Sequence, residues 1–496
     1  MCSIIGYSGK KDAAPILVRS LGKMEYRGYD SVGIATKNGN IIDVKKGVGK
    51  VSEVSQNLQL DGMLGTIGIG HTRWATHGKV TKENAHPHYS NSGKIAIVHN
   101  GIIENFQELK DQLALDGFSF QSDTDSEIIA NLIQQKFEET GNIKETIIES
   151  ISKLKGHYSF MVIFEDGTLA AARLREPLVI GVEKDGYYIS SDVLGFIEKT
   201  DNAIYIDNEN FVVINNLDLK IFDFNGISIK PNITTVSKEF ADVYKGDYAH
   251  FTLKEISEQN ETILVSRNTT QIEQVSREIQ NTKNLYVTGS GSSYNAAEVM
   301  KYLLSKFTKI RINTVIASEL PFSPETIEQN STFIAISQSG ESADVLESVR
   351  IAKEFKSNIL SIINHPNSSL SQESNHIVGL NCGPEIGVAA TKSFTSQLGI
   401  IYKITDKLCG GCINPDWGKV SESISEILSQ NKQIKELSKN LKDISDIYVL
   451  GRGIHLPIAK EAALKLKELT YIHAEGLSLI HISEPTRPRL ISYAVF

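Results

Sequence analysis

Short apolar runs separated by turn residues fill the first 240 residues, a pattern typical of β-strands joined by tight connections. Residues 13–24 and 126–137 instead carry apolar side chains at helical spacing. Many strands with few amphipathic helices predict an antiparallel sheet sandwich covered by helices. The predicted strands span residues 67–70, 94–98, 158–164, 169–172, 178–182 and 187–190.

From about residue 276 the pattern changes to strand, loop and helix in turn. Buried apolar runs at 284–287, 332–336 and 358–363 predict strands, and amphipathic stretches at 294–307 and 344–355 predict helices. This alternation is typical of a parallel sheet with helices on both faces. Ligands of such sheets bind at the carboxyl ends of the strands.

Three further segments complete the predicted organisation. Residues 240–263 mix charged and aromatic residues without a clear period, whereas residues 271–281 predict a helix. The run 447–450 with its following glycines faintly repeats residues 286–291, which predicts a second parallel-sheet unit with a helix over 457–469. No period continues after residue 476. The predicted domains are therefore 2–240, a connector at 241–275, 276–420, a partial unit at 430–476 and a tail at 477–496.

The composition is that of an ordinary globular protein: 41% of the 496 residues are hydrophobic and 22% are charged. The net charge of -8 gives no positive field to attract nucleic acid or an anionic membrane, so neither is an expected partner. No apolar run approaches the roughly 18 residues of a membrane span, and no secretory signal precedes Cys2.

The chain has only four cysteines, Cys2, Cys382, Cys409 and Cys412, too few for a disulfide scaffold. This favours a cytoplasmic location. Cys409 and Cys412 form one isolated C-x-x-C without the second ligand pair that a metal knuckle needs. We therefore expect their role to be structural.

Cys2 follows the initiator methionine directly, and removal of Met1 before so small a side chain would leave Cys2 as the first residue. Cys2 would then carry a thiol and a free α-amine. The thiolate is a nucleophile, and an α-amine with a pKa of about 7.7–8.0 can act as its general base. The N-terminus therefore predicts an N-terminal nucleophile.

Polar stretches follow the predicted strands at residues 71–78, 99–105 and 122–125. Arg73 and Asp125 together can hold the carboxylate and the amine of a small zwitterion, although a surface ion pair is the alternative. The Asn100 side chain and the Gly101 amide can stabilise an oxyanion.

A histidine-rich group lies in and beside the first two of these stretches. Its His-x-His spacing suits zinc, but hydrogen bonding at strand ends is the favoured interpretation, and no metal is expected. The group consists of His71, His77, His86, His88 and His99.

Cys2, residues 25–31, residues 71–78, the Asn100-Gly101 pair and Asp125 together resemble the class II glutamine amidotransferases. The resemblance implies an N-terminal-nucleophile αββα sandwich, in which the cysteine attacks the side-chain amide of L-glutamine and releases ammonia. By resemblance, Cys2, Asn100 and Gly101 are catalytic and the last two form the oxyanion hole. Glutamine would be bound by Arg73 at its carboxylate, by Asp125 at its amine, and by His77 and Trp74, with Trp74 at the mouth of an ammonia passage.

Two loops rich in glycine and serine, 289–293 and 337–342, each open a predicted helix. The free N–H groups and the positive dipole at a helix N-terminus attract phosphate. A dinucleotide site is the weaker alternative because the third glycine of that motif is missing. A purely structural turn is another alternative for each loop.

With residues 385–392, these loops resemble the doubly wound α/β fold of the sugar isomerase (SIS) domains. By resemblance, the helix at 457–469 carries Glu468 as the base that moves a proton between sugar carbons, with Glu461 and Lys465 supporting it. Without that context these charges would form a solvated face. The resemblance assigns the sugar phosphate to Ser290, Gly291, Ser292, Ser293, Ser337, Gln338, Ser339, Ser342 and Val388.

The pairing of the two domain types resembles an amidotransferase family that converts fructose 6-phosphate to glucosamine 6-phosphate, the first step of hexosamine and UDP-N-acetylglucosamine synthesis. It implies a multidomain α/β protein without a cofactor, which is a homodimer in its intact form. The tail at 477–496 resembles foreign sequence, and the family's later histidine and lysine are absent, so we expect at most glutaminase activity from this chain. The alternatives are amination of another ketose phosphate and a non-enzymatic sugar-phosphate-binding protein.

Overall fold

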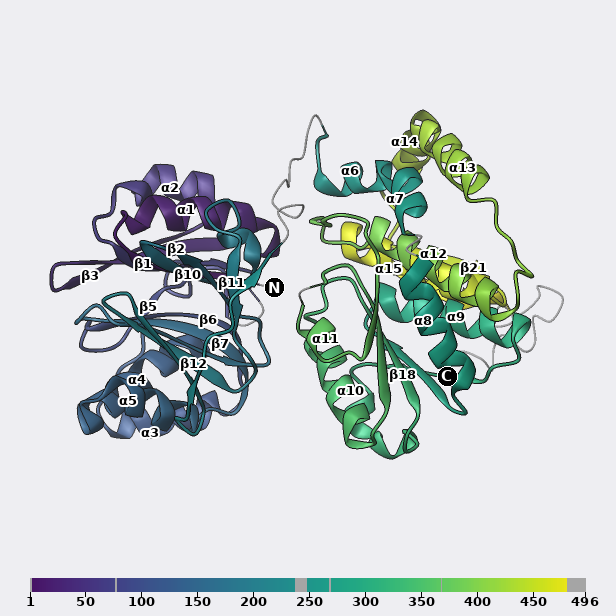
Figure 1. Ribbon diagram of the computed structural model, residues 1–496. Coiled ribbons are helices and arrows are strands. Elements are labelled where there is room, and N and C mark those ends of the chain that lie inside the picture. Colours follow the sequence, from purple (N-terminus) through teal and green to yellow (C-terminus); the bar gives the residue numbers. More distant parts are fainter. Residues whose placement is uncertain (1, 76–77, 237–247, 267–268, 367, 480–496) are drawn as a thin grey trace, which may run out of the picture. The chain divides into compact units, whose positions relative to one another are not determined.

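The computed structural model describes residues 2–75, 78–236, 248–266, 269–366 and 368–479. The chain divides into two compact units, Met1–Asp242 and Val243–Phe496 (Figure 1). Each unit has its own hydrophobic core and is described by itself.

Unit 1 has four layers, with helices outside two antiparallel sheets (Figure 1). The two sheets pack on each other through apolar side chains such as Ile4 and Ile69 from one and Val98 and Met161 from the other. The helices α3, α4 and α5 cover the outer face of the second sheet. These layers confirm the predicted αββα sandwich.

The first sheet of unit 1 has the order β15-β11-β9-β10-β1-β4-β2-β3 and the second has the order β14-β13-β12-β8-β7-β6-β5. The strands are β1 (Ser3–Gly9), β2 (Ser31–Asn38), β3 (Ile41–Val48), β4 (Ile67–Arg73), β5 (His88–Tyr89), β6 (Ile95–Ile103), β7 (Gly156–Phe164), β8 (Leu169–Leu174), β9 (Val179–Glu183), β10 (Gly186–Ser190), β11 (Asn202–Tyr205), β12 (Asn210–Asn215), β13 (Asp218–Asp223), β14 (Ser228–Ile229) and β15 (Thr234–Thr235). The helices are α1 (Ala13–Met24), α2 (Val51–Leu58), α3 (Phe106–Leu115), α4 (Asp125–Thr140) and α5 (Ile143–Ile151).

All the strands and helices predicted in unit 1 are present, with small shifts at their ends. The strand predicted over 94–98 continues to Ile103 because the polar Asn100 and Gly101 also pair with β7. The central strand β1, which follows Cys2 directly, was not predicted. Its small residues, Ser3, Gly6 and Ser8, are buried between neighbouring strands and carry little hydrophobic signal.

Unit 2 contains a five-stranded parallel sheet of order β17-β16-β18-β19-β20 with helices on both faces, as predicted. The helices α8, α9 and α12 share a core with one face, and α10 and α11 share a core with the other. After β16 the chain forms β17 on one side of β16 and then β18 on its other side. The strand order therefore reverses between β16 and β18. A crevice at such a reversal is where doubly wound sheets bind ligands.

The strands of this sheet are β16 (Leu285–Gly289), β17 (Ile312–Ile316), β18 (Thr332–Ser337), β19 (Asn358–Ile363) and β20 (His376–Gly379). The helices of unit 2 up to residue 440 are α6 (Phe251–Ser257), α7 (Gln259–Val265), α8 (Thr269–Asn281), α9 (Ser292–Phe307), α10 (Ala343–Glu354), α11 (Ser369–Gln372), α12 (Lys392–Leu408), α13 (Trp417–Ser429) and α14 (Asn431–Asn440).

The connector is more regular than predicted, since α6 and α7 occupy a stretch that showed no period. Each helix has only seven residues, too short to be stable alone or to display a clear apolar face. Contacts with α12 and α13 hold α7 in place. The helical structure of this segment therefore depends on tertiary packing, which cannot be predicted from the local sequence.

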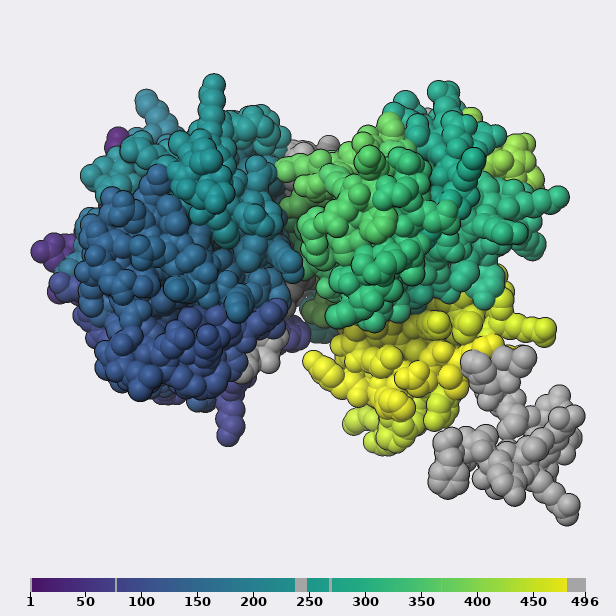
Figure 2. Space-filling model, turned by 90° about the horizontal axis from the view of Figure 1, so that it is seen from below, coloured from purple at the N-terminus to yellow at the C-terminus, as the bar shows by residue number. Residues whose placement is uncertain are grey.

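The last described part of the chain is a βαβ unit, with β21 (Asp446–Gly451) and β22 (His473–Ser478) parallel on either side of α15 (His455–Thr470). It forms the yellow surface along one edge of unit 2 (Figure 2). Strand β22 extends to Ser478, two residues into the predicted tail. Residues 480–496 lie outside the described residues. Among the helices that are described, none combines the length and apolarity that a membrane crossing requires.

Candidate active site

Cys2 lies at the start of β1, beside β4 and close to β6. Ser3 pairs with Thr72, which brings Cys2 next to the residues that end β4. The Trp74 backbone N–H donates to Cys2 Sγ at 3.2 Å, and Asn100 Nδ2 donates to the Cys2 backbone oxygen at 3.3 Å. The predicted nucleophile and one predicted oxyanion donor therefore share one site.

The electrostatic surroundings of the Cys2 thiol act in opposite directions. Burial raises the pKa of the thiol above its ordinary value, whereas the Trp74 N–H and the charges of Arg73 and Arg27 lower it. Burial has the larger effect, so the thiol is mainly protonated at neutral pH. Attack on a substrate therefore requires a base, the part that the freed α-amine of Cys2 would take. Met1 lies outside the described residues.

The predicted glutamine-binding residues Arg73 and Asp125 are only 4% and 8% exposed, so the alternative of a surface ion pair is wrong. Burial lowers the pKa of Arg73, and the nearby groups of Cys2, Asp30 and Asp125 raise it, which indicates that these groups converge. Asp125 Oδ2 accepts a hydrogen bond from the Ile103 N–H at 2.9 Å. The predicted binding residue His77 lies outside the described residues.

Gly101 has the backbone geometry that only glycine adopts easily. Its φ is +114°, and a Cβ at this position would lie 2.1 Å from the backbone oxygen of His157. The strand pairing of Asn100 and Gly101 with β7 fixes both residues beside the start of β1. Their predicted role in the oxyanion hole thus has a rigid support in the sheet.

Residues 28–30 position the segment after β4, a role that sequence analysis missed although it singled out the motif. A Cβ on Gly28 would lie 2.8 Å from the backbone of Arg73 and Trp74, so the close approach requires glycine. Asp30 accepts a hydrogen bond from the Ala75 N–H at 2.8 Å. The only sequence signal was the density of polar residues and glycine in a short stretch.

Four of the histidines form a buried group, the histidine stack, in which three rings pack on one another and His99 is joined by hydrogen bonds. The rings of His71 and His86 stack with centroids 4.0 Å apart, and His88 packs edge-on against His86 at 4.7 Å. His71 Nε2 lies 3.0 Å from the His99 oxygen, and His99 Nδ1 lies 2.8 Å from Ser126 Oγ. These contacts confirm the hydrogen-bonding interpretation. Within the described residues, no group of three His, Cys, Asp or Glu side chains is arranged to hold a metal ion.

Burial lowers the pKa of all four histidines, that of His71 to about 3, and keeps the stack neutral. Through His99 and Ser126 the stack links β6, which carries Asn100, to the start of α4, which carries Asp125. Sequence analysis did not predict that the histidines position these two site residues.

In unit 2 the two serine-rich loops follow β16 and β18, the neighbouring strands at the reversal of sheet order. Ser290 Oγ is buried and has no hydrogen-bond partner among the described residues. Gly291 has a φ of +55°, and Ser292 opens α9. Ser293 Oγ accepts a hydrogen bond from Gln397 at 3.0 Å.

In the second loop, serine hydroxyls accept hydrogen bonds from backbone N–H groups of the same loop. Ser337 Oγ accepts from the Gly340 N–H at 3.0 Å, and Ser339 Oγ accepts from the Glu341 N–H at 3.1 Å. Ser342 is the N-cap of α10. The Gln338 backbone oxygen accepts from Asn364 at 3.2 Å. The predicted sugar-phosphate residues of both loops thus meet at the carboxyl edge of the sheet, beside the N-termini of α9 and α10.

The charged residues of α15 face the first of these loops. Glu461 is 6% exposed and accepts a hydrogen bond from Asn295 Nδ2 at 2.8 Å. Lys465 Nζ donates to Ser292 Oγ at 3.0 Å and to Glu468 Oε2 at 2.6 Å. The alternative of a solvated face is therefore wrong for Glu461 and Lys465. The structure brings all three predicted acid–base residues beside the loop that is predicted to bind phosphate.

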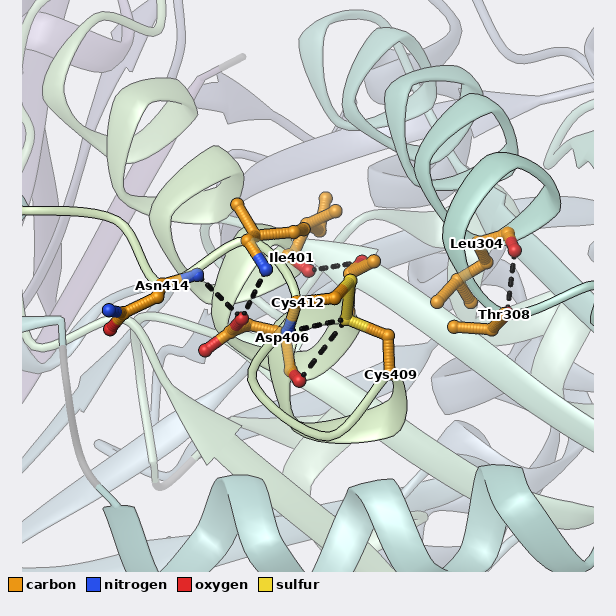
Figure 3. Close-up of a disulfide and its surroundings, with 9 residues drawn as sticks. Leu304, Thr308, Ile401, Asp406, Cys409, Cys412 and Asn414 are labelled. Atoms are coloured by element: carbon orange, nitrogen blue, oxygen red, sulfur yellow. Dashed lines mark hydrogen bonds between the residues drawn. A yellow bond between two sulfur atoms is a disulfide. The ribbon is translucent and has the colours of Figure 1, made fainter.

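Cys409 and Cys412 form a disulfide just after α12, which the cysteine count had not led us to expect (Figure 3). The Asp406 carboxylate accepts hydrogen bonds from the backbone N–H groups of Ile413 and Asn414 at 2.9 and 2.8 Å. The disulfide and Asp406 together shape the turn from α12 toward α13, a structural role.

Two family models match the chain: one described as "Glutamine amidotransferase domain" at residues 60–259, and one described as "SIS domain" at residues 278–404. The chain is 40% identical over 491 residues to the glutamine–fructose-6-phosphate aminotransferase (isomerizing) of Pyrococcus horikoshii, covering 96% of this chain and 82% of that one. It is 40% identical over 504 residues to the protein of the same name from Francisella tularensis, with the same coverage.

Among solved structures, the C-terminal domain of glucosamine-fructose-6-phosphate aminotransferase from Francisella tularensis is 35% identical. The match covers 48% of this chain and 72% of that one, with a TM-score of 0.43.

A glutaminase-type sandwich and a sugar-isomerase-type sheet in one chain define a glutamine amidotransferase coupled to an SIS domain. At 40% identity over most of both sequences, the relatives identify the family more closely. The chain belongs to the glutamine–fructose-6-phosphate aminotransferase (isomerizing) family.

Proposed function

We propose that this chain takes ammonia from L-glutamine at Cys2 for the conversion of fructose 6-phosphate to glucosamine 6-phosphate, the first step of hexosamine synthesis. Of this reaction we expect the chain itself to complete at most the glutaminase half. Family membership supports the overall reaction. The observation that carries the glutaminase half is the position of Cys2 Sγ, 3.2 Å from the Trp74 N–H and beside Asn100.

In the glutaminase reaction the α-amine of Cys2 takes the proton of the thiol, and the thiolate attacks the side-chain carbonyl carbon of glutamine. Asn100 Nδ2 and the Gly101 N–H donate to the oxyanion of the tetrahedral intermediate. Collapse of this intermediate releases ammonia and leaves a thioester on Cys2, which water hydrolyses to glutamate. Arg73 and Asp125 hold the carboxylate and the amine of glutamine throughout.

In unit 2 the serine hydroxyls and the N-termini of α9 and α10 bind the phosphate of the open-chain sugar. In the complete reaction of the family, ammonia and the C2 carbonyl of fructose 6-phosphate form an imine with loss of water. Glu468 is in the position of the base that would then move a proton from C1 to C2, which gives glucosamine 6-phosphate. Lys465, hydrogen-bonded to both Glu468 and Ser292, fixes the base relative to the phosphate-binding loop.

Replacing the nucleophile tests the glutaminase half directly. Cys2→Ser should lower glutamate release from glutamine by at least about 10³-fold, because the hydroxyl is a far weaker nucleophile than the thiolate. Cys382→Ser is the matched control, since Cys382 is buried in unit 2. Glutamate release by Cys2→Ser at the wild-type rate would refute the assignment.

The acceptor sugar and the assembly are tested separately. Isothermal titration calorimetry should show tighter binding of fructose 6-phosphate than of other ketose phosphates, and tighter binding of another sugar would favour the alternative amidotransferase.

The homodimer and the cytoplasmic location predicted from the sequence are tested by light scattering of the purified chain and by fractionation of the source cells.

A further inference from the structure

Glu255, on the connector helix α6, is a buried carboxylate that the proposed mechanism does not use. It is 2% exposed, and its Oε1 accepts hydrogen bonds from the consecutive backbone N–H groups of Ile386 and Gly387. Gly387 also donates to Oε2 at 3.1 Å. A buried carboxylate is costly unless such donors compensate its charge, so this contact fixes the 385–391 loop to α6.

Gly387 permits the backbone of the 385–391 loop to lie close to α6. A Cβ on Gly387 would lie 2.4 Å from Glu255 Oε2 and 2.6 Å from Thr252 Oγ1. The loop backbone therefore lies directly against α6, and a larger residue at position 387 would push the two apart.

A second set of contacts holds the far end of the same loop. Lys392 is 4% exposed, and its Nζ donates to Glu258 Oε2 at 2.6 Å. The Glu385 carboxylate accepts from the Thr391 and Ser393 N–H groups at 2.8 and 3.1 Å. Both ends of the loop are thus anchored by carboxylates.

Between the two anchors lies Val388, which is 59% exposed. Asn364 connects this region to the second serine-rich loop, since its backbone N–H donates to the Gln338 oxygen and its Nδ2 donates to the Gly383 oxygen at 2.6 Å. These bonds place Gly383, two residues before the 385–391 loop, beside the second serine-rich loop at the carboxyl edge of the sheet.

We propose that Glu255 is a positioning residue for sugar-phosphate binding, which it supports by fixing the loop that presents Val388. The proposal rests on the proposed function of unit 2. Glu255 lies outside residues 278–404, which match the SIS domain. The sugar site thus depends on a side chain that the connector supplies, within unit 2 but before the SIS match begins.

The test compares Glu255→Gln with Glu261→Gln, a matched change at an exposed position of α7. The glutamine amide presents only one acceptor oxygen, so Glu255→Gln should weaken binding of fructose 6-phosphate about tenfold in calorimetry. The kcat/KM for glutamine hydrolysis and the midpoint of thermal unfolding should stay at wild-type values. Glu261→Gln should bind the sugar as the wild type does, and Glu255→Asp should recover part of the loss.

Hydrogen exchange of the peptide spanning residues 383–391 reports on the contact without any ligand. Faster exchange in Glu255→Gln than in Glu261→Gln supports the proposal, and equal exchange overturns it while leaving the proposed function intact. Equal loss of sugar binding, glutaminase activity and thermal stability would assign Glu255 a merely structural role and overturn the proposal. A wild-type chain that binds no fructose 6-phosphate would overturn the proposed function of unit 2 and, with it, the role of Glu255, even where the exchange result stands.

Discussion

The position of Cys2 depends on groups from three separate stretches of the chain. The Trp74 N–H donates to the sulfur, Asn100 donates to the Cys2 backbone, and Gly28 allows the Arg73–Trp74 backbone to approach. The sequence predicted Cys2, Arg73 and Asn100 because each carries reactive or polar chemistry. It did not predict the role of Gly28, since a close backbone approach leaves no chemical signature in the residue itself.

A substitution of Arg73 tests the binding of glutamine. Arg73→Lys keeps the charge but loses the planar fork that matches a carboxylate, so the KM for glutamine should rise roughly 10- to 100-fold with a smaller change in kcat. Steady-state assays of glutamate release measure both constants. Arg19→Lys, at a surface ion pair with Glu198, is the control and should leave them unchanged. An unchanged KM in Arg73→Lys would remove Arg73 from the glutamine site.

Among the elements, long periodic segments were predictable and short ones were not. The helix α1 and the strand β19 have the predicted bounds, because each carries a clear apolar period. The helices α6 and α7 were missed because their stability comes from packing on distant segments. The contact of Glu255 with Gly387 was missed for the same reason, since 132 residues separate the two partners.

The turn after α12 allows a test of a single disulfide. The Cys409–Cys412 bond spans a sequence separation of only three, so it removes little entropy from the unfolded chain and should stabilise unit 2 by at most about 2 kcal/mol. Thermal unfolding with and without a dithiol reductant measures this difference. The double variant Cys409→Ser/Cys412→Ser should show no response to the reductant. A much larger effect, or a loss of glutaminase activity on reduction, would contradict the assigned role.

For the molecule as a whole, the two units have separate cores, and the histidine stack is confined to unit 1. Burial holds the folded-state pKa of His71 near 3, below its unfolded value of about 6.5. Between these values the unfolded state binds a proton that the folded state does not. The stability that neutral His71 contributes is therefore fully present above about pH 6.5 and is lost as the pH falls toward 3. His157, whose pKa is raised by Glu176, acts in the opposite direction.

Acid should therefore destabilise unit 1. Between pH 7 and pH 5, His71 alone should lower the free energy of unfolding of unit 1 by about 2 kcal/mol. The other three buried histidines should also lower it. Calorimetric unfolding at several pH values measures the effect, with the loss of glutaminase activity identifying the transition of unit 1. His71→Gln should weaken the pH dependence. A stability of unit 1 that is constant from pH 7 to pH 5 would contradict a neutral, buried stack.

We propose that Met1 is removed and that the thiol of the resulting N-terminal Cys2 attacks glutamine. Mass spectrometry of the chain after reaction with a glutamine analogue that carries an electrophilic ketone measures this most directly. We expect one adduct, located on an N-terminal Cys2 from which Met1 has been removed, with glutaminase activity lost in proportion to labelling. An adduct on another residue, or full activity in a chain that retains Met1, would contradict it.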